Sequence, residues 1–189
     1  MSPTSSGAAA RTATASVSSS PGSPLARLVT GAIALFERLP NTAIAFIARF
    51  SVAAVFWNSG QTKVEGFVLN FVSGEFALGW PRLSDSAVSL FQDEYKLPFI
   101  APELAAPMAA LAEHVFPLLL LIGLATRLSA LALLVMTLVI QVFVYPGAYA
   151  THGTWAAVLL YLMARGPGAL SVDHWLAGRH AAAHPQRRR

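Results

Sequence analysis

Five residues in apolar stretches of this sequence have side chains that could bind a ligand or move a proton: Arg49, Trp57, Glu113, His114 and Gln141. Arginine and glutamine can hold carbonyl oxygens, whereas a carboxylate and an imidazole can exchange a proton. Polar groups that converge in apolar surroundings are typical of a small-molecule site. The sequence therefore predicts a ligand-binding site, and a quinone-like or other small apolar molecule is the ligand that it suits.

Arg49 and Glu113 are the two ionisable residues that we expect to form a pair. At about 1.5 Å per residue, Arg49 lies on the order of 10–12 Å inside its apolar segment and Glu113 on the order of 16 Å inside the next one. An arginine side chain can close that gap, with His114 or Gln141 nearby. Three interpretations are open. The pair is a clamp between two helices, it lines a cavity for a polar headgroup or a proton, or Arg49 extends to the surface.

Several cofactor classes do not fit the sequence. The chain has no cysteine, which excludes disulfides, a thiolate nucleophile and a thiol-ligated iron–sulfur cluster. Glu113 and His114 are adjacent and point about 100° apart on a helix, so no metal site is predicted. The histidines at 114, 152 and 174 lie at different depths, which argues against haem. Walker and Rossmann glycine motifs are absent, and nothing indicates nucleotide or nucleic-acid binding.

Apolar helices must position these residues. The sequence is 55% hydrophobic and 12% charged, against about 25% charged in an ordinary soluble domain. A helix needs about 20 apolar residues to cross a bilayer, and a soluble helical hairpin would show a polar face that 113–146 lacks. The predicted fold is therefore all-α, a polytopic membrane four-helix bundle. Its spans are expected at 43–60, 104–124, 128–145 and, shorter than the others, 154–164.

The remaining segments complete the expected organisation. A long extracytoplasmic excursion over 61–103 separates the first two spans, and Ser84 begins a short amphipathic helix in it. Arginines gather on the side of the termini, whereas 61–103 is acidic, so the positive-inside rule puts both termini in the cytoplasm. We expect four regions: a disordered tail over 1–24, an interfacial amphipathic helix over 25–39, the four-helix domain over 40–176 and a basic cytoplasmic tail over 177–189.

A second set of residues is expected at the outer surface, where a partner could bind. Glu94, Tyr95 and Lys96 belong to the excursion, and His152 and Trp155 share one face at the outer end of the fourth span. His152 has an alternative role as the cap of an interfacial helix. The lipid bilayer is the partner that composition demands, and an oligomer is compatible with the pattern.

A set of motifs over about 49–176 resembles the DoxX family of small four-helix bacterial membrane proteins. These motifs are FWNSGQTKVEGF, FQDEYKLPFIAPELAA, AEHVFPLLLLIGLATR, MTLVIQVFVYPGAY, HGTW and RGPGALSVDHWL. The resemblance implies a multi-pass protein of the bacterial inner membrane. The family that it resembles is named for a subunit of thiosulfate:quinone oxidoreductase, and some of its members are linked to oxidoreductase complexes, oxidative or thiol stress, and metal stress.

Two hypotheses follow, and whether the chain is an enzyme is open. In the first, it is an accessory subunit of a membrane redox or stress-response system and holds a quinone-like ligand in the bundle. In the second, it is a non-catalytic membrane anchor or transport component that recruits a soluble partner, for example in metal stress. The lack of cysteine argues against direct sulfur transfer.

Overall fold

The computed structural model describes residues 23–70 and 74–183, which belong to two units, Met1–Leu39 and Pro40–Arg189. The first unit contains helix α1 (Pro24–Glu37), whose N-cap Ser23 accepts a hydrogen bond from the backbone N–H of Ala26. No residue of α1 is buried. The predicted helix is thus present, and its place in a membrane interface stays a prediction. The predicted tail over 1–24 lies outside the described residues, except for its last two.

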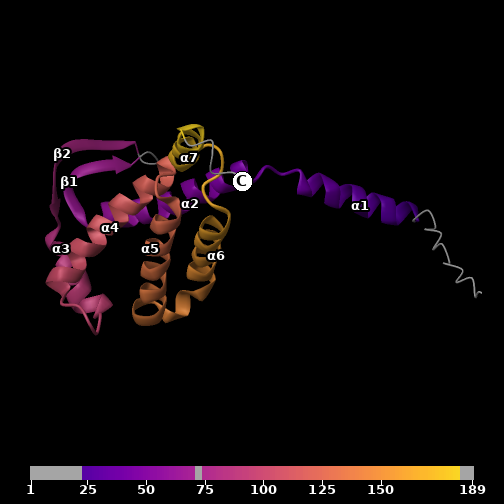
Figure 1. Cartoon of the computed structure of the whole chain (residues 1–189). Coiled ribbons are helices and arrows are strands. Elements are labelled where there is room, and N and C mark those ends of the chain that lie inside the picture. Colours follow the sequence, from indigo (N-terminus) through magenta and orange to yellow (C-terminus); the bar gives the residue numbers. More distant parts are fainter. Residues whose placement is uncertain (1–22, 71–73, 184–189) are drawn as a thin grey trace, which may run out of the picture. The chain divides into compact units, whose positions relative to one another are not determined.

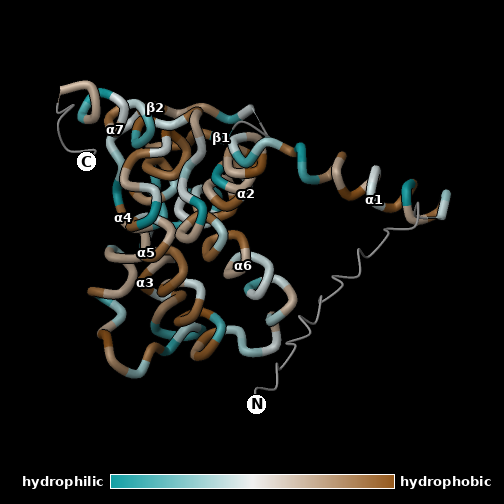
Figure 2. The backbone as a smooth tube through the Cα atoms, turned by 45° about the vertical axis from the view of Figure 1, so that its right-hand side comes forward, coloured by the Kyte–Doolittle hydropathy of each residue, from teal (hydrophilic) through white to brown (hydrophobic). Residues whose placement is uncertain are grey.

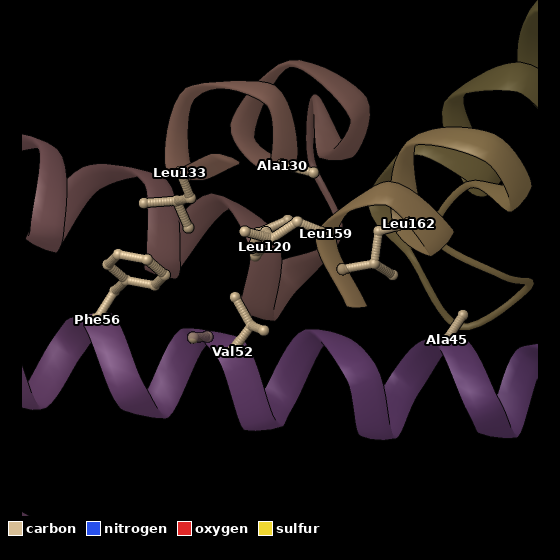
Figure 3. Packing of buried hydrophobic residues seen from close by; sticks show 9 residues of the cluster. Ala45, Val52, Phe56, Leu120, Ala130, Leu133, Leu159 and Leu162 are labelled. Carbon is tan, nitrogen blue, oxygen red and sulfur yellow. The ribbon is translucent and has the colours of Figure 1, made fainter. Parts of the chain in front are cut away.

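In the second unit, four helices contribute to one hydrophobic core (Figures 1 and 3). These helices are α2 (Asn41–Gln61), α4 (Pro102–Ile122), α5 (Thr126–Val139) and α6 (Tyr149–Arg165). Figure 3 shows residues of α2 facing leucines of the other three helices. The buried cluster consists of Ala45, Val52, Ala53, Phe56, Leu120, Ala130, Leu133, Leu159 and Leu162.

Three helices of the described chain are long and apolar enough to cross a membrane: Asn41–Gln61, Pro102–Ile122 and Thr126–Val144. The third combines α5 with the short π-helix η2 (Ile140–Val144). Their positions confirm the first three predicted helices to within a few residues. The helix expected at 154–164 is α6, which has 17 residues and follows the 3₁₀ turn η3 (Pro146–Ala148). Figure 2 shows apolar residues, in brown, recurring along the helices of this unit.

The all-α prediction needs one correction, because the segment after α2 forms a β-hairpin. Strands β1 (Val64–Asn70) and β2 (Glu75–Leu83) pair antiparallel. The register shifts at Gly66, which has φ +80°. A Cβ on Gly66 would lie 2.7 Å from the carbonyl oxygen of Trp80, and one on Gly79 would collide with the carbonyl oxygen of Gly66. The backbones of the two strands therefore approach each other closely at Gly66 and Gly79.

Two short helical segments and a C-terminal helix complete the unit. Helix α3 (Asp85–Leu90) begins after the predicted cap Ser84, whose hydroxyl accepts from the N–H of Ser86. The π-helix η1 (Phe91–Tyr95) follows and packs on the start of α4 through a second buried cluster, Ala87, Phe91, Ala105 and Ala106. Helix α7 (Val172–Ala183) runs into the predicted basic tail, whose residues 184–189 lie outside the described part.

Candidate functional site

Glu113 of α4 lies in a buried salt bridge with Lys63, which follows the end of α2. Lys63 Nζ is 2.7 Å from Glu113 Oε2, and the two side chains are 2% and 4% exposed. The hydroxyl of Ser59 donates to Glu113 Oε1 over 3.2 Å. Lys63 also donates to the carbonyl and hydroxyl oxygens of Ser59. Both charges are thus paired and hydrogen-bonded, as buried charges require.

His114, the next residue, takes part in a hydrogen-bonded chain that ends on the hairpin. Its Nδ1 lies 2.6 Å from the carbonyl oxygen of Ala110, and its Nε2 lies 2.9 Å from Gln61 Nε2. A carbonyl only accepts and an amide nitrogen only donates, which assigns the imidazole proton to Nδ1. Gln61 Oε1 in turn accepts from the N–H of Leu69 in β1 over 2.8 Å. Both nitrogens of the neutral ring are therefore used.

Trp57 makes the second connection between α2 and β1. Its Nε1 donates to the carbonyl oxygen of Leu69 over 3.0 Å, so the side chains of Trp57 and Gln61 together bind both backbone groups of Leu69. The indole lies edge-on to His114, with ring centroids 5.0 Å apart. Three of the predicted ligand-binding residues, Trp57, Glu113 and His114, are thus close together at the hairpin end of α2.

Close helix packing at Gly60 allows this arrangement. A Cβ on Gly60 would lie 2.8 Å from Cε1 of His114 and 3.1 Å from Cβ of Glu113. These distances are below ordinary van der Waals contact, so a larger residue at this position would require the side chains of His114 and Glu113 to shift.

The predicted pairing of Arg49 with Glu113 is wrong. Arg49 is 1% exposed, and its Nη1 donates to the carbonyl oxygens of Leu120 and Leu121 over 3.2 and 3.1 Å. Its Nη2 donates to the carbonyl oxygen of Leu170 over 2.5 Å. The last carbonyls of a helix have no partner within the helix and carry the negative end of its dipole. Arg49 therefore caps the C-terminus of α4, about 10 Å along the axis from Glu113.

Asp173 of α7 caps the next helix in a complementary way. Its Oδ1 and Oδ2 accept from the backbone N–H groups of Ala125 and Thr126 over 2.8 and 2.9 Å. Ala125 has φ +48° and immediately precedes α5. The turn between α4 and α5 is therefore held by a cation at the end of one helix and an anion at the start of the next.

Gln141 belongs to a third location, the joint between α5 and α6. Its Oε1 lies 2.8 Å from Nδ1 of His152, and its Nε2 donates to the carbonyl oxygen of Pro146 over 2.7 Å. His152 is buried, and its ring lies 5.1 Å from that of Trp155. Trp155 is half-buried and packs on Phe56 in the core. These contacts place His152 and Trp155 inside the protein.

The remaining predicted partner-binding residues lie at the junction of η1 and η2. Glu94 accepts a hydrogen bond from the hydroxyl of Tyr145, and this bond raises the pKa of Tyr145 above its ordinary value. Tyr95 is half-buried between the rings of Phe91 and Tyr145, and burial is the main cause that raises its pKa. Lys96 is exposed, with the left-handed φ of +44°.

Sequence reasoning did not identify four of these residues: Ser59, Gln61, Lys63 and Asp173. The sequence contained a signal that Lys63 could lie in the site, because it follows an apolar helix closely and lies only six positions beyond Trp57. Asp173 does not cap a helix that follows it directly in the sequence. It caps α5, which begins 47 residues earlier in the chain. No local pattern announces such a long-range cap.

One comparison with known proteins identifies the family of this chain. The family model described as DoxX matches residues 44–146, which contain most of α2, the hairpin, α4 and α5 together with Lys63, Glu113 and His114. No curated protein and no solved structure was found to match the chain. The match covers more than half of the sequence, so this chain belongs to the DoxX family, a family of membrane proteins.

Proposed function

We propose that this chain is a non-catalytic accessory subunit of a membrane complex and holds a partner protein through residues 64–101, hereafter the outer platform. In this proposal α2, α4, α5 and α6 cross the bacterial inner membrane, with both termini in the cytoplasm and the platform outside. The observation that carries the proposal is that the candidate reactive side chains of the bundle, Glu113, His114 and Gln141, bind other side chains and backbone groups. They are arranged to hold the structure.

Each candidate reactive group has its bonds within the protein. Glu113 is paired with Lys63, His114 uses both ring nitrogens, and Gln141 bonds with both ends of its amide. A general acid or base must reach its substrate within hydrogen-bond distance. Each of these groups would first have to break a bond that supports the fold, which favours a structural role.

The outer platform is fixed firmly to the bundle. Its first strand starts directly after the buried Lys63, and Leu69 in that strand is bound on both sides by Trp57 and Gln61. At its other end, Phe91 packs against the first residues of α4. A surface held in this way loses little conformational entropy on binding, which is an advantage for recognition.

The exposed face of β2 suits a protein partner. Phe76, Leu78 and Trp80 stand at every second position of the strand and are 59%, 81% and 84% exposed. Over its whole length the platform carries five carboxylates against two basic side chains, Arg82 and Lys96. An acidic surface is repelled by anionic lipid headgroups but complements a basic protein surface. The partner is therefore expected to combine an apolar contact with a basic rim.

The redox or stress-response setting is part of this proposal and rests on what the resemblance implies. A quinone-like ligand is the second candidate, favoured by the proximity of Trp57, Glu113 and His114. Such a ligand would displace Gln61 from Nε2 of His114. It predicts that a soluble ubiquinone analogue raises the Tm of the purified protein. The proposal of a non-catalytic accessory subunit predicts an unchanged Tm.

The direct test replaces Trp80 with serine and compares the proteins that co-purify from native membranes. The matched control is Trp175→Ser, which removes an exposed tryptophan from α7. We expect one protein to co-purify in a constant ratio with wild type and W175S, to be lost with W80S, and to dissociate more readily at high salt. An identical set of proteins with W80S would refute the proposal, as would a loss only of bound lipid.

A further inference from the structure

A groove lies at the end of the bundle where α5 begins and α6 ends. It has a volume of about 800 Å³, and its walls include Thr126 and Arg127 of α5, Arg165 of α6, and the following loop and α7. Volumes of roughly 300–1,000 Å³ are usual for sites that bind small molecules or headgroups. In the proposed topology this groove opens at the cytoplasmic surface of the membrane.

Two arginines give the groove its charge. Arg127 and Arg165 are both exposed, and neither forms a salt bridge with any residue in the described part of the chain. Gly166, directly after Arg165, lies beside the guanidinium of Arg127, since a Cβ there would be 3.7 Å from Nη2. The two positive charges therefore line one groove while coming from different helices.

The acidic residue in the same lining does not neutralise them. Both carboxylate oxygens of Asp173 accept backbone N–H groups at the start of α5. Asp173 is also close enough to the buried Arg49 for Coulombic attraction. Its charge is thus compensated by the helix terminus and Arg49, which leaves Arg127 and Arg165 available to an anion.

A buried donor lies at the same place. Thr126 is fully buried, belongs to the groove lining, and its hydroxyl has no hydrogen-bond partner among the described residues. Buried hydroxyls normally have a partner. A hydroxyl and two guanidinium groups in the lining of one groove are a combination that suits a phosphate group.

We propose that this groove binds a phosphate group, supplied by the headgroup of an anionic phospholipid in the cytoplasmic leaflet. Arg127 and Arg165 stand at the ends of apolar helices, where lipid phosphates lie, and basic pockets between helices on this side recognise such headgroups. Arginine binds phosphate with two parallel hydrogen bonds, so its planar shape as well as its charge contributes.

The test uses the full chain in nanodiscs of phosphatidylcholine with or without phosphatidylglycerol. The variant R127Q/R165Q is compared with R38Q/R179Q, which removes two arginines outside the groove. Native mass spectrometry measures the retained phosphatidylglycerol. We expect retention by wild type and the control, and about thirtyfold weaker binding by R127Q/R165Q, since each arginine near an anionic surface contributes about 1 kcal/mol. Equal retention by R127Q/R165Q and R38Q/R179Q would overturn the proposal.

Two further arms identify the source of the phosphate and the role of arginine. In phosphatidylcholine nanodiscs, inorganic phosphate should leave the Tm unchanged; a rise in Tm that R127Q/R165Q abolishes would reject the lipid as the source. The variant R127K/R165K keeps the charge and should bind phosphatidylglycerol between wild type and R127Q/R165Q. Binding by R127K/R165K as weak as that of R127Q/R165Q, together with equally low Tm values, would mean that the substitutions act on the fold and not on a headgroup.

Discussion

Lys63 and Glu113, 50 residues apart in the chain, form a salt bridge whose Nζ to Oε2 distance is 2.7 Å and whose side chains are almost completely buried. The bridge joins the base of the hairpin to the middle of α4. Burying two charges is expensive, and their attraction offsets this cost only while both are present.

Removing one partner should therefore be far more harmful than removing both. We expect Lys63→Met and Glu113→Leu each to destabilise the protein by about 3–5 kcal/mol, and the double variant to be near wild type. Thermal unfolding in detergent, arranged as a double-mutant cycle, measures the coupling. Additive losses in the double variant would show that the bridge contributes little.

Arg49 should behave as a residue independent of Glu113. Arg49→Met leaves the carbonyls of Leu121 and Leu170 without the Arg49 donor, whereas the carbonyl of Leu120 keeps the N–H of Gly123. An acceptor left unsatisfied costs about 1–3 kcal/mol where it is buried. Because Arg49 and Glu113 share no partner, their effects should add to within about 0.5 kcal/mol. A coupling energy well above that value would restore the pairing that the sequence suggested.

The error about Arg49 has a physical origin. Counting residues from helix ends places a side chain at a depth but says nothing of the backbone acceptors beside it. The carbonyls at the end of α4 lie within hydrogen-bond distance of Arg49, and Lys63, which follows α2, forms the salt bridge with Glu113. An estimate of depth compares only the positions of side chains, whereas the backbone carbonyls at a helix terminus are also strong hydrogen-bond partners.

The sequence predicted the helices but not the hairpin, because the prediction relied on apolar segments that must be buried. Long apolar runs with few charges determine α2, α4 and the α5–η2 helix almost without context. The strand pattern was present, since Phe76, Leu78 and Trp80 alternate with smaller or polar residues. These three side chains are exposed, so a prediction based on burial does not identify the strand. The sequence placed Trp57, Glu113 and His114 in one predicted site but did not include Gln61, which bonds with His114 and Leu69.

Gly60 offers a test of the close crossing between α2 and α4. Alanine at this position would bring Cβ within 2.8 Å of the His114 ring, and we expect a destabilisation of about 1–3 kcal/mol from overpacking. Gly153→Ala in α6 is the matched control, because its Cβ would meet Tyr149 at an ordinary 3.5 Å. The control should gain up to about 1 kcal/mol from helix propensity. Equal Tm changes in the two variants would contradict the close crossing.

Tyr145 should make stability depend on alkaline pH. Its hydrogen bond to Glu94 raises its pKa in the folded state, so the folded chain keeps a proton that the unfolded chain releases above about pH 10. The stabilisation is complete below pH 10 and is lost as the pH rises through the raised pKa. The absorbance titration of phenolate, taken as wild type minus Tyr145→Phe, should show ionisation shifted to higher pH. Glu94→Gln should move it back, and an unshifted difference titration would exclude the bond.

The absence of cysteine allows a direct test of four crossings by single-cysteine labelling. Helix α6 has 17 residues, about 26 Å, so it can span a slightly thinned bilayer. Asp93, Gly147 and Gly178 are exposed, and Gly147 and Gly178 have open space for a side chain. In spheroplasts, a membrane-impermeant maleimide should label D93C and G147C, but G178C only after permeabilisation. Labelling of G147C and G178C from the same side would show that α6 does not cross. Labelling of G178C alone would keep four crossings and invert the orientation, which would move the outer platform and its partner to the cytoplasm.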